Sequence, residues 1–186
     1  NLGNIANLNR SSALNATALI ESWDTKLEDV IQYLRGRDAT PLQALQVIEQ
    51  SNSSGNRHFE LIGPDYTGYL ARRDETGGFI PLSYQQGTYY DLQKAIDDRA
   101  DAAYEDVCFA PEFTDGHTAL KYFAIYRHLP LRDGAGEMRS YALLLATRSA
   151  DMLDTLNSQT GFTGQSTVLI KETGEYLVGS ADFKSD

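Results

Sequence analysis

The segments that decide the fold are Ala119-Leu-Lys-Tyr-Phe-Ala-Ile-Tyr126, Arg132-Asp-Gly-Ala-Gly136 and Ser140-Tyr-Ala-Leu-Leu-Leu-Ala146. The first and last are rich in aromatic and aliphatic residues, as strands are, and the Asp-Gly between them is a hairpin signal. We therefore predict two antiparallel strands, Ala119 to His128 and Met138 to Thr147, which are the strongest strand patterns of the chain.

Weaker strand patterns lie on both sides of this hairpin. Phe59 to Ile62 and Gly68 to Arg72 flank a Gly-Pro-Asp turn and form a second predicted hairpin. Ser166 to Ile170 and Tyr176 to Val178 form a third. Phe79-Ile-Pro-Leu82 contains a proline and is therefore a poor central strand.

Helical patterns fill much of the rest. One apolar stripe runs along the N-terminal region at the spacing of a helix, through Ile20, Trp23, Leu27, Val30, Ile31 and Leu34. This helix ends near Gly36, and Thr40-Pro41 begins a second helix as N-cap and first helical residue. Shorter helices are predicted over Asp91 to Ala103 and from Ser149, which serves as an N-cap.

The order of these elements predicts an α+β fold, in which a long N-terminal helix packs on a central antiparallel sheet with short flanking helices. We expect the helices to gather at the ends and on one face of the sheet. The other face and a central pocket would then be free for a ligand.

Composition argues against several kinds of binding partner and site. A formal net charge of -10 argues against binding to nucleic acid or to an anionic membrane surface. With Cys108 as the only cysteine, an internal disulfide and a cysteine-based zinc cluster are excluded. The sequence has no run of 18 or more apolar residues and no signal peptide. Because it starts within a helical pattern and stops soon after a strand pattern, we expect a piece of a larger protein.

Four segments carry a resemblance to a known family. Asp133 to Leu153 and Thr160 to Val178 resemble the turn, strand, short helix and final hairpin of Cache domains, the PAS-like extracytoplasmic sensors of bacterial receptors. Gly87 to Ala95 is similar to the aromatic pair that opens a helix in front of the family's pocket. Tyr104 to Pro111 resembles the next segment, where the chain re-enters the sheet. Thr88 stands where the family often has Arg, which argues against a carboxylate clamp of the family's kind.

The resemblance implies a non-enzymatic, ligand-sensing domain on the periplasmic or extracellular face of the bacterial inner membrane, within a receptor such as a histidine kinase or chemoreceptor. It implies a division into residues 1–37, a helix for signalling and dimerisation, and residues 38–186, the sensor domain. The expected partners are a small molecule and a second copy of the chain, without nucleic acid and without a cofactor. Membrane attachment would come only through flanking segments.

Candidate ligand-binding residues follow from this placement. They are Tyr89, Tyr90, Tyr104, Lys121, Phe123, Tyr126 and Tyr141. A tyrosine offers a flat apolar face and a hydroxyl to a small organic ligand, although core packing explains such residues equally well. Lys121 either lies at the sheet edge with its stem on apolar surface or faces an anionic ligand.

Catalytic and metal sites are not predicted. Cys108, His117 and either Asp115 or Asp106 could form a nucleophile–base–orienter set. A small buried hydrophobe is the more usual role for a cysteine between its neighbours Val107 and Phe109. The three histidines, at positions 58, 117 and 128, do not have the spacing of metal ligands. Two alternatives to the sensor remain open: a cytosolic PAS- or GAF-like binding domain, and a ligand-free module whose pocket is filled by its own tyrosines.

Overall fold

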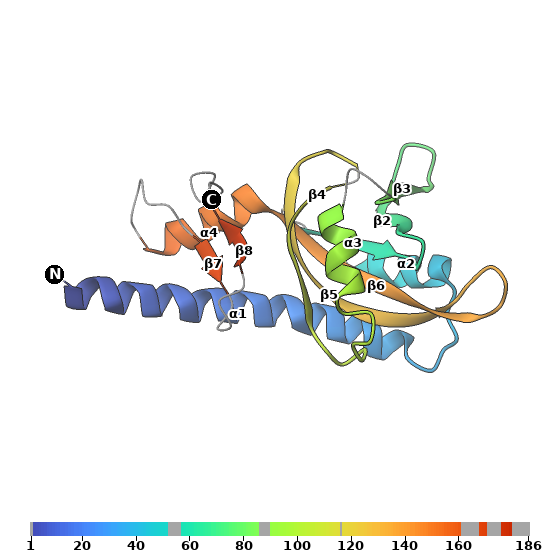
Figure 1. The fold of residues 1–186 in the computed structure, drawn as a ribbon. Coiled ribbons are helices and arrows are strands. Elements are labelled where there is room, and N and C mark those ends of the chain that lie inside the picture. The colour runs from blue at the N-terminus through green and yellow to red at the C-terminus, as the bar shows by residue number, and fades with distance from the viewer. Residues whose placement is uncertain are drawn as a thin grey trace.

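The computed structural model describes residues 2–51, 57–85, 90–115, 117–160, 168–170 and 176–179. For residues 2–12, 90 and 156–160 and for the last two strands, the backbone alone is described. At the centre is a six-stranded sheet with the order β3-β2-β1-β6-β5-β4, and a separate pair is formed by β7 and β8 (Figure 1). All paired strands are antiparallel, so the predicted α+β class is confirmed.

All three predicted hairpins are present. β5 (Lys121–Arg132) pairs with β6 (Met138–Arg148), β1 (Arg57–Ile62) pairs with β2 (Thr67–Arg73), and β7 (Val168–Ile170) pairs with β8 (Tyr176–Gly179). β1 also pairs with β6, which joins the first two hairpins into one sheet.

The two edge strands both contain a proline. β3 (Phe79–Ser83) holds Pro81, and β4 (Cys108–Thr114) holds Pro111 within a register shift between Ala110 and Phe113. Because proline cannot donate a hydrogen bond to a second neighbour, it is tolerated at an edge and disfavoured in the middle of a sheet. This explains why Phe79 to Leu82 is an outer strand, and why β4, which the sequence indicated only as re-entry into the sheet, ends the other side.

Helix α1 (Leu2–Leu34) has the predicted apolar stripe, and the stripe lies against the sheet. Trp23, Leu27 and Ile31 are each at most 3% exposed. Figure 1 shows this helix running beside α4 and on under the sheet, along most of the length of the molecule. Within the described part of the chain, no helix is long and apolar enough to cross a membrane.

Helix α2 (Pro41–Ser51) begins as predicted. The backbone N–H of Gln43 donates to Thr40 Oγ1 at 3.3 Å, and the Gln43 side chain accepts from the Thr40 N–H at 3.0 Å, a reciprocal cap that satisfies two free donors. Ala44, Leu45 and Ile48 join the stripe of α1 in one core with the inner residues of the sheet. Helices α1 and α2 therefore cover one face.

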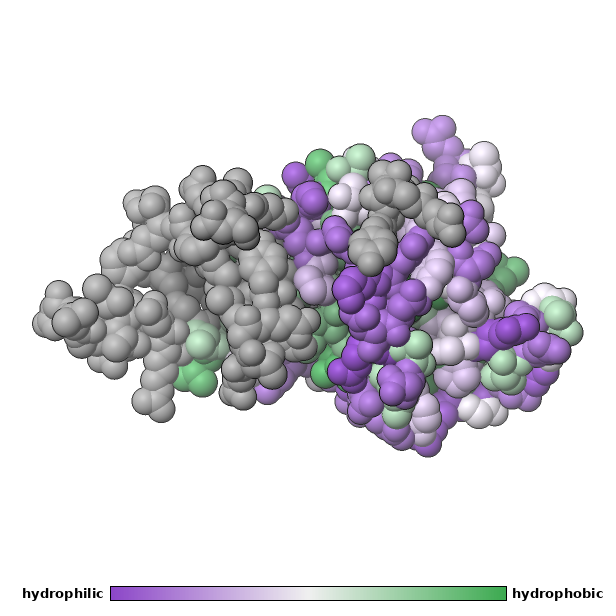
Figure 2. Space-filling model, in the orientation of Figure 1, coloured by the Kyte–Doolittle hydropathy of each residue, from purple (hydrophilic) through white to green (hydrophobic). Residues whose placement is uncertain are grey.

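Helix α3 (Tyr90–Asp97) covers the opposite face, so the expectation that helices leave one face free is wrong. Leu92 is fully buried there, and Ala95 and Ile96 pack beside it in a second core. The outer side of α3 is charged, and at its place Figure 2 shows a continuous hydrophilic strip. With α1 and α2 packed on the first face, the apolar side of α3 packs on the second.

Helix α4 (Ser149–Thr160) follows β6 directly and contacts α1. The predicted N-cap is wrong in its chemistry: Ser149 Oγ is buried and makes no hydrogen bond in the structure as described.

Candidate functional site

The sheet face beneath α3 carries a row of very short side chains. Ala110 on β4 lies opposite Ala124 on β5, which lies opposite Ala146 on β6, which in turn lies opposite His58 on β1. All three alanines are fully buried. Their period-2 positions place them on the α3 side, because their chain neighbours Phe123, Ile125 and Leu145 belong to the core under α1.

Large aromatic side chains fill the rest of this face. Tyr84 and Tyr126 are 0% exposed and Phe113 is 1% exposed. The ring of Phe113 lies 6.0 Å from that of Tyr84 and 6.5 Å from that of Tyr122, centroid to centroid. Burial raises the pKa of the Tyr126 and Tyr122 hydroxyls, so both stay neutral at physiological pH.

Four hydrogen bonds fasten α3 and the turn after it over this face. The Tyr126 hydroxyl donates to Ala95 O at 2.7 Å, and the His128 ring contacts Arg99 O at 2.8 Å through Nε2. The Gln93 side chain donates to the carbonyl of Tyr84. The fourth comes from the β1–β2 turn, where the Tyr66 hydroxyl donates to Asp97, and this bond raises the pKa of Tyr66 to about 12.

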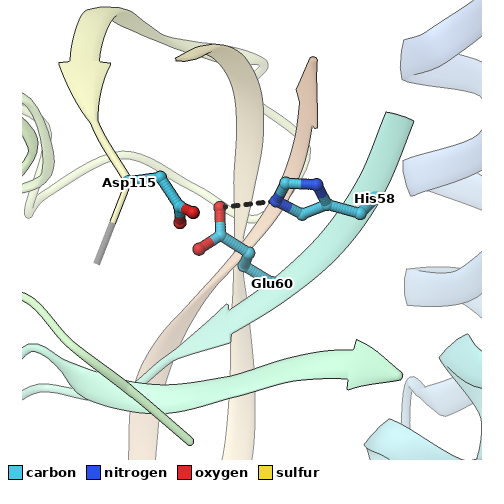
Figure 3. A group of neighbouring side chains, drawn as sticks. All are labelled: His58, Glu60 and Asp115. Atoms are coloured by element: carbon cyan, nitrogen blue, oxygen red, sulfur yellow. Dashed lines mark ion pairs between the residues drawn. The ribbon is translucent and has the colours of Figure 1, made fainter. Parts of the chain in front are cut away.

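A polar cluster lies at one end of the alanine row (Figure 3). Glu60 and His58 project from β1, and Asp115 follows β4. Glu60 is 0% and Asp115 is 3% exposed. One hydroxyl joins the two carboxylates, because Tyr84 Oη lies 2.5 Å from Glu60 Oε1 and 3.1 Å from Asp115 Oδ1.

The loop after β4 holds the Asp115 carboxylate in place. Thr118 donates to Asp115 Oδ2 through its backbone N–H at 2.9 Å and through its hydroxyl at 2.7 Å. The loop closes with the Asp115 N–H donating to Leu120 O at 2.8 Å, and Ala119 takes a left-handed backbone with φ of 59°. An alanine there indicates that the surrounding hydrogen bonds hold the loop in one conformation.

Of the predicted ligand-binding residues, only Tyr126 is seen on the face beneath α3. Tyr90 is the first residue of α3, but its side chain lies outside the described residues, as does the whole of Tyr89. Lys121 is exposed at the beginning of β5, beside the edge strand. Whether any of them touches a ligand stays a prediction.

The other three predicted residues belong to the α1 side. Phe123 is fully buried under α1, and Tyr104 and Tyr141 pack at the margin of that core. Tyr104 also lies under the Arg35 guanidinium, 4.5 Å from ring centroid to Cζ, and lines a cavity of about 60 Å³. That volume is far below the roughly 300 Å³ of typical small-molecule pockets. The structure thus divides the predicted set between two faces.

The residues considered for a catalytic set are also placed. Cys108 is 1% exposed in the core beneath α3, while His117 is exposed in the loop after β4. Asp115 makes its hydrogen bonds with Tyr84 and Thr118. The sequence did not indicate the proximity of His58, Glu60 and Asp115, although the His-x-Glu spacing on a strand already places the first two on one face.

Comparison with solved structures identifies the architecture. The ligand-binding domain of the Campylobacter jejuni chemoreceptor Tlp3 in complex with L-valine aligns over 97% of this chain and 71% of its own, with a TM-score of 0.62 and 10% identity. The chain has the fold of bacterial chemoreceptor ligand-binding domains. Two further ligand-binding domains agree. That of Pseudomonas aeruginosa PctC in complex with GABA aligns over 97% of this chain and 76% of its own, with a TM-score of 0.58 and 16% identity. That of Pseudomonas fluorescens CtaA in complex with L-serine aligns over 97% of this chain and 73% of its own, with a TM-score of 0.60 and 13% identity.

At these identities the likeness concerns the fold, and it confirms at that level the resemblance to Cache sensor domains seen in the sequence. No protein-family model and no curated protein sequence matches the chain.

Proposed function

We propose that this chain is the extracytoplasmic, non-enzymatic sensor domain of a bacterial transmembrane receptor, and that it binds a small organic molecule between the sheet and α3. The observation that carries the proposal is the in-register row Ala110–Ala124–Ala146 beneath a helix held by four hydrogen bonds. Short side chains beneath a covering helix leave room for a ligand that is largely buried, as small-molecule sites require.

The comparisons support this assignment. Domains of the same fold are described in complexes with L-valine, L-serine and GABA, which are small and bear an amino group. Residues placed at or near α3, namely Tyr90 and Tyr126, are the proposed ligand contacts, together with Tyr89 and the edge residue Lys121. A periplasmic location follows if the receptor resembles the periplasmic sensory domain of Campylobacter jejuni Tlp1.

Signal transfer would use α1. The stripe of this helix forms one core with β5 and β6, so a ligand that moves those strands also shifts the helix. In the receptor we place a second copy of the chain against the N-terminal part of α1, and output domains beyond the chain.

A thermal-shift panel tests the sensor proposal. The protein is heated in the presence of a metal chelator with L-valine, L-serine, GABA, other amines, carboxylates and sugars. A ligand at about 100 times its Kd adds about 2.7 kcal/mol to the free energy of unfolding, which raises Tm by about 5 to 10 °C in a domain of this size.

A matched pair of variants locates the site. Tyr126→Phe removes a hydroxyl beneath α3, and Tyr141→Phe makes the same change at the margin of the α1 core. A shift weakened in Y126F and kept in Y141F places the ligand beneath α3, and the reverse places it on the other face and contradicts the proposal.

A second candidate is favoured by one observation. Much of the face beneath α3 is already filled by the buried side chains of Tyr84, Phe113 and Tyr126. This is what we would expect of a ligand-free module that signals by binding a partner protein. The absence of any thermal shift across the panel would reject the sensor and favour this module.

A further inference from the structure

The cluster of His58, Glu60 and Asp115 has the composition of a metal site. One imidazole nitrogen and two carboxylate oxygens lie within 4.8 Å of one another, and Figure 3 shows the three side chains turned toward a common centre. His58 and Glu60 are two residues apart on β1, so the strand itself directs both to one face.

Two atoms of the cluster are buried without a hydrogen bond. Glu60 Oε1 accepts from Tyr84, but Glu60 Oε2 makes no hydrogen bond, and neither does the buried His58 Nε2. These two atoms lie 3.3 Å apart, an ion pair when the imidazole is protonated (Figure 3), although they do not form a hydrogen bond. Buried polar atoms of this kind are rare, and each one calls for a partner.

Among the described residues, the cluster's charge is balanced only by His58, and only while its imidazole is protonated. The single proton of the Tyr84 hydroxyl can be donated to one carboxylate at a time, although the hydroxyl lies close to both. In the part of the chain that the structure describes, no lysine or arginine forms an ion pair with Glu60 or Asp115. Two carboxylates buried together are strongly stabilised by a cation.

We propose that His58, Glu60 and Asp115 bind a divalent transition-metal cation of the Zn²⁺ class. In a tetrahedral site with bonds of about 2.0–2.1 Å, neighbouring ligand atoms are about 3.3–3.4 Å apart. The 3.3 Å between His58 Nε2 and Glu60 Oε2 fits that spacing. Two carboxylates neutralise the charge of the ion, and the imidazole selects against Mg²⁺ and Ca²⁺, which prefer oxygen ligands only.

The surroundings support the three ligands. Tyr84 holds one oxygen of Glu60 and leaves the other free, and Thr118 orients Asp115 with two hydrogen bonds. The rings of His58 and Tyr122 pack edge to face with their centroids 5.0 Å apart, and this contact restrains the imidazole. Such outer contacts fix the ligands of metal sites. The His58 side chain is 21% exposed, which provides a route to the cluster from solvent.

Calorimetric titration of the untagged, chelator-treated chain with ZnCl₂ tests the proposal, which goes beyond the sensing role and does not depend on it. We expect one Zn²⁺ per chain, a concentration-dependent rise in Tm, and no response to CaCl₂. Glu60→Gln and His58→Gln should weaken binding by at least about 100-fold, the upper end of what the loss of an outer contact alone does.

The matched control is His117→Gln, which removes an exposed histidine two residues from Asp115 and should leave the affinity unchanged. The Tm of each variant in chelator reports whether it is folded. If a cluster variant fails to fold, the visible absorption of the Co²⁺-loaded native chain decides, because a four-coordinate site absorbs far more strongly than aqueous Co²⁺.

Three outcomes overturn the proposal: no stoichiometric Zn²⁺ binding, equal binding by E60Q and H58Q, or binding that is lost in H117Q. An amine that raises Tm in chelator and loses its effect in E60Q, without any Zn²⁺ binding, would assign the cluster to an organic cation. That result would reject the metal and leave the sensor proposal standing.

Discussion

Arg127 joins the sheet to the long helix through its guanidinium. Its Nε and Nη2 donate to the two carboxylate oxygens of Asp24 on α1 at 2.7 and 2.6 Å, and Nη1 donates to Glu105 O at 2.9 Å. The two side chains are 9% and 23% exposed. Because both charges are largely removed from water, Asp24→Asn should lower the free energy of unfolding by about 2–3 kcal/mol.

Urea denaturation measures that change, and the same substitution at Asp38 is the control. Asp38 pairs with Arg132 at 3.2 Å, but its side chain is 69% exposed, so Asp38→Asn should change the free energy by less than about 1 kcal/mol. Equal effects of the two substitutions would show that the buried pair does not stabilise the docking of α1.

His128 makes stability depend on pH. Burial lowers its pKa, and the neutral ring is satisfied on both sides, with Nε2 at 2.8 Å from Arg99 O and Nδ1 at 3.2 Å from Ser140 Oγ. The folded pKa lies below the unfolded value of about 6.5, so the unfolded chain binds the proton more readily. The contribution to stability is therefore full above pH 6.5 and decreases as the pH falls below it.

Thermal unfolding at pH 7.5 and 5.5 checks this. We expect Tm to decrease more between pH 7.5 and pH 5.5 in the native protein than in His128→Gln. A loss in the variant as large as in the native protein would contradict the assignment.

At the scale of elements, the β1–β2 hairpin depends on a glycine. A Cβ on Gly68 would lie 1.8 Å from Leu61 O on the paired strand, so Gly68→Ala must push the strands apart. We expect a loss of at least about 3 kcal/mol in the free energy of unfolding, as for other severe backbone clashes. Gly134 in the β5–β6 turn has nothing within 4 Å of the same position, and Gly134→Ala should be tolerated within about 0.5 kcal/mol. Equal Tm values for the two variants would exclude this packing of the hairpin.

At the scale of the molecule, α1 should unfold together with the sheet. Trp23, the single tryptophan, is 3% exposed on α1 and lies 6.3 Å from the Phe123 ring on β5. Its fluorescence therefore reports on docking of the helix, whereas tyrosine near-ultraviolet circular dichroism also reports on the face beneath α3. We expect the same melting midpoint from both signals. An earlier transition of Trp23 would mean that α1 detaches from a folded sheet.

Local sequence determined the elements and their class. The stripe of α1, the Thr40–Gln43 cap and the three hairpins depend on interactions within a few residues, so their patterns are readable along the chain. The resemblance to sensor domains came from the same local order. The division at residue 37 and the ligand-binding role of the seven chosen residues stay predictions.

Tertiary structure alone decided how distant positions meet. Strand alternation separates Phe123 from Tyr126, but only the position of α3 shows that Tyr126 lies beneath a helical cover. Likewise, β1 and β4 are separated in the sheet by β6 and β5, and the row of alanines between them carries no motif. Asp115 therefore reaches His58 and Glu60 only through strand order, register and the loop after β4, which are set by long-range pairing and not by local propensity.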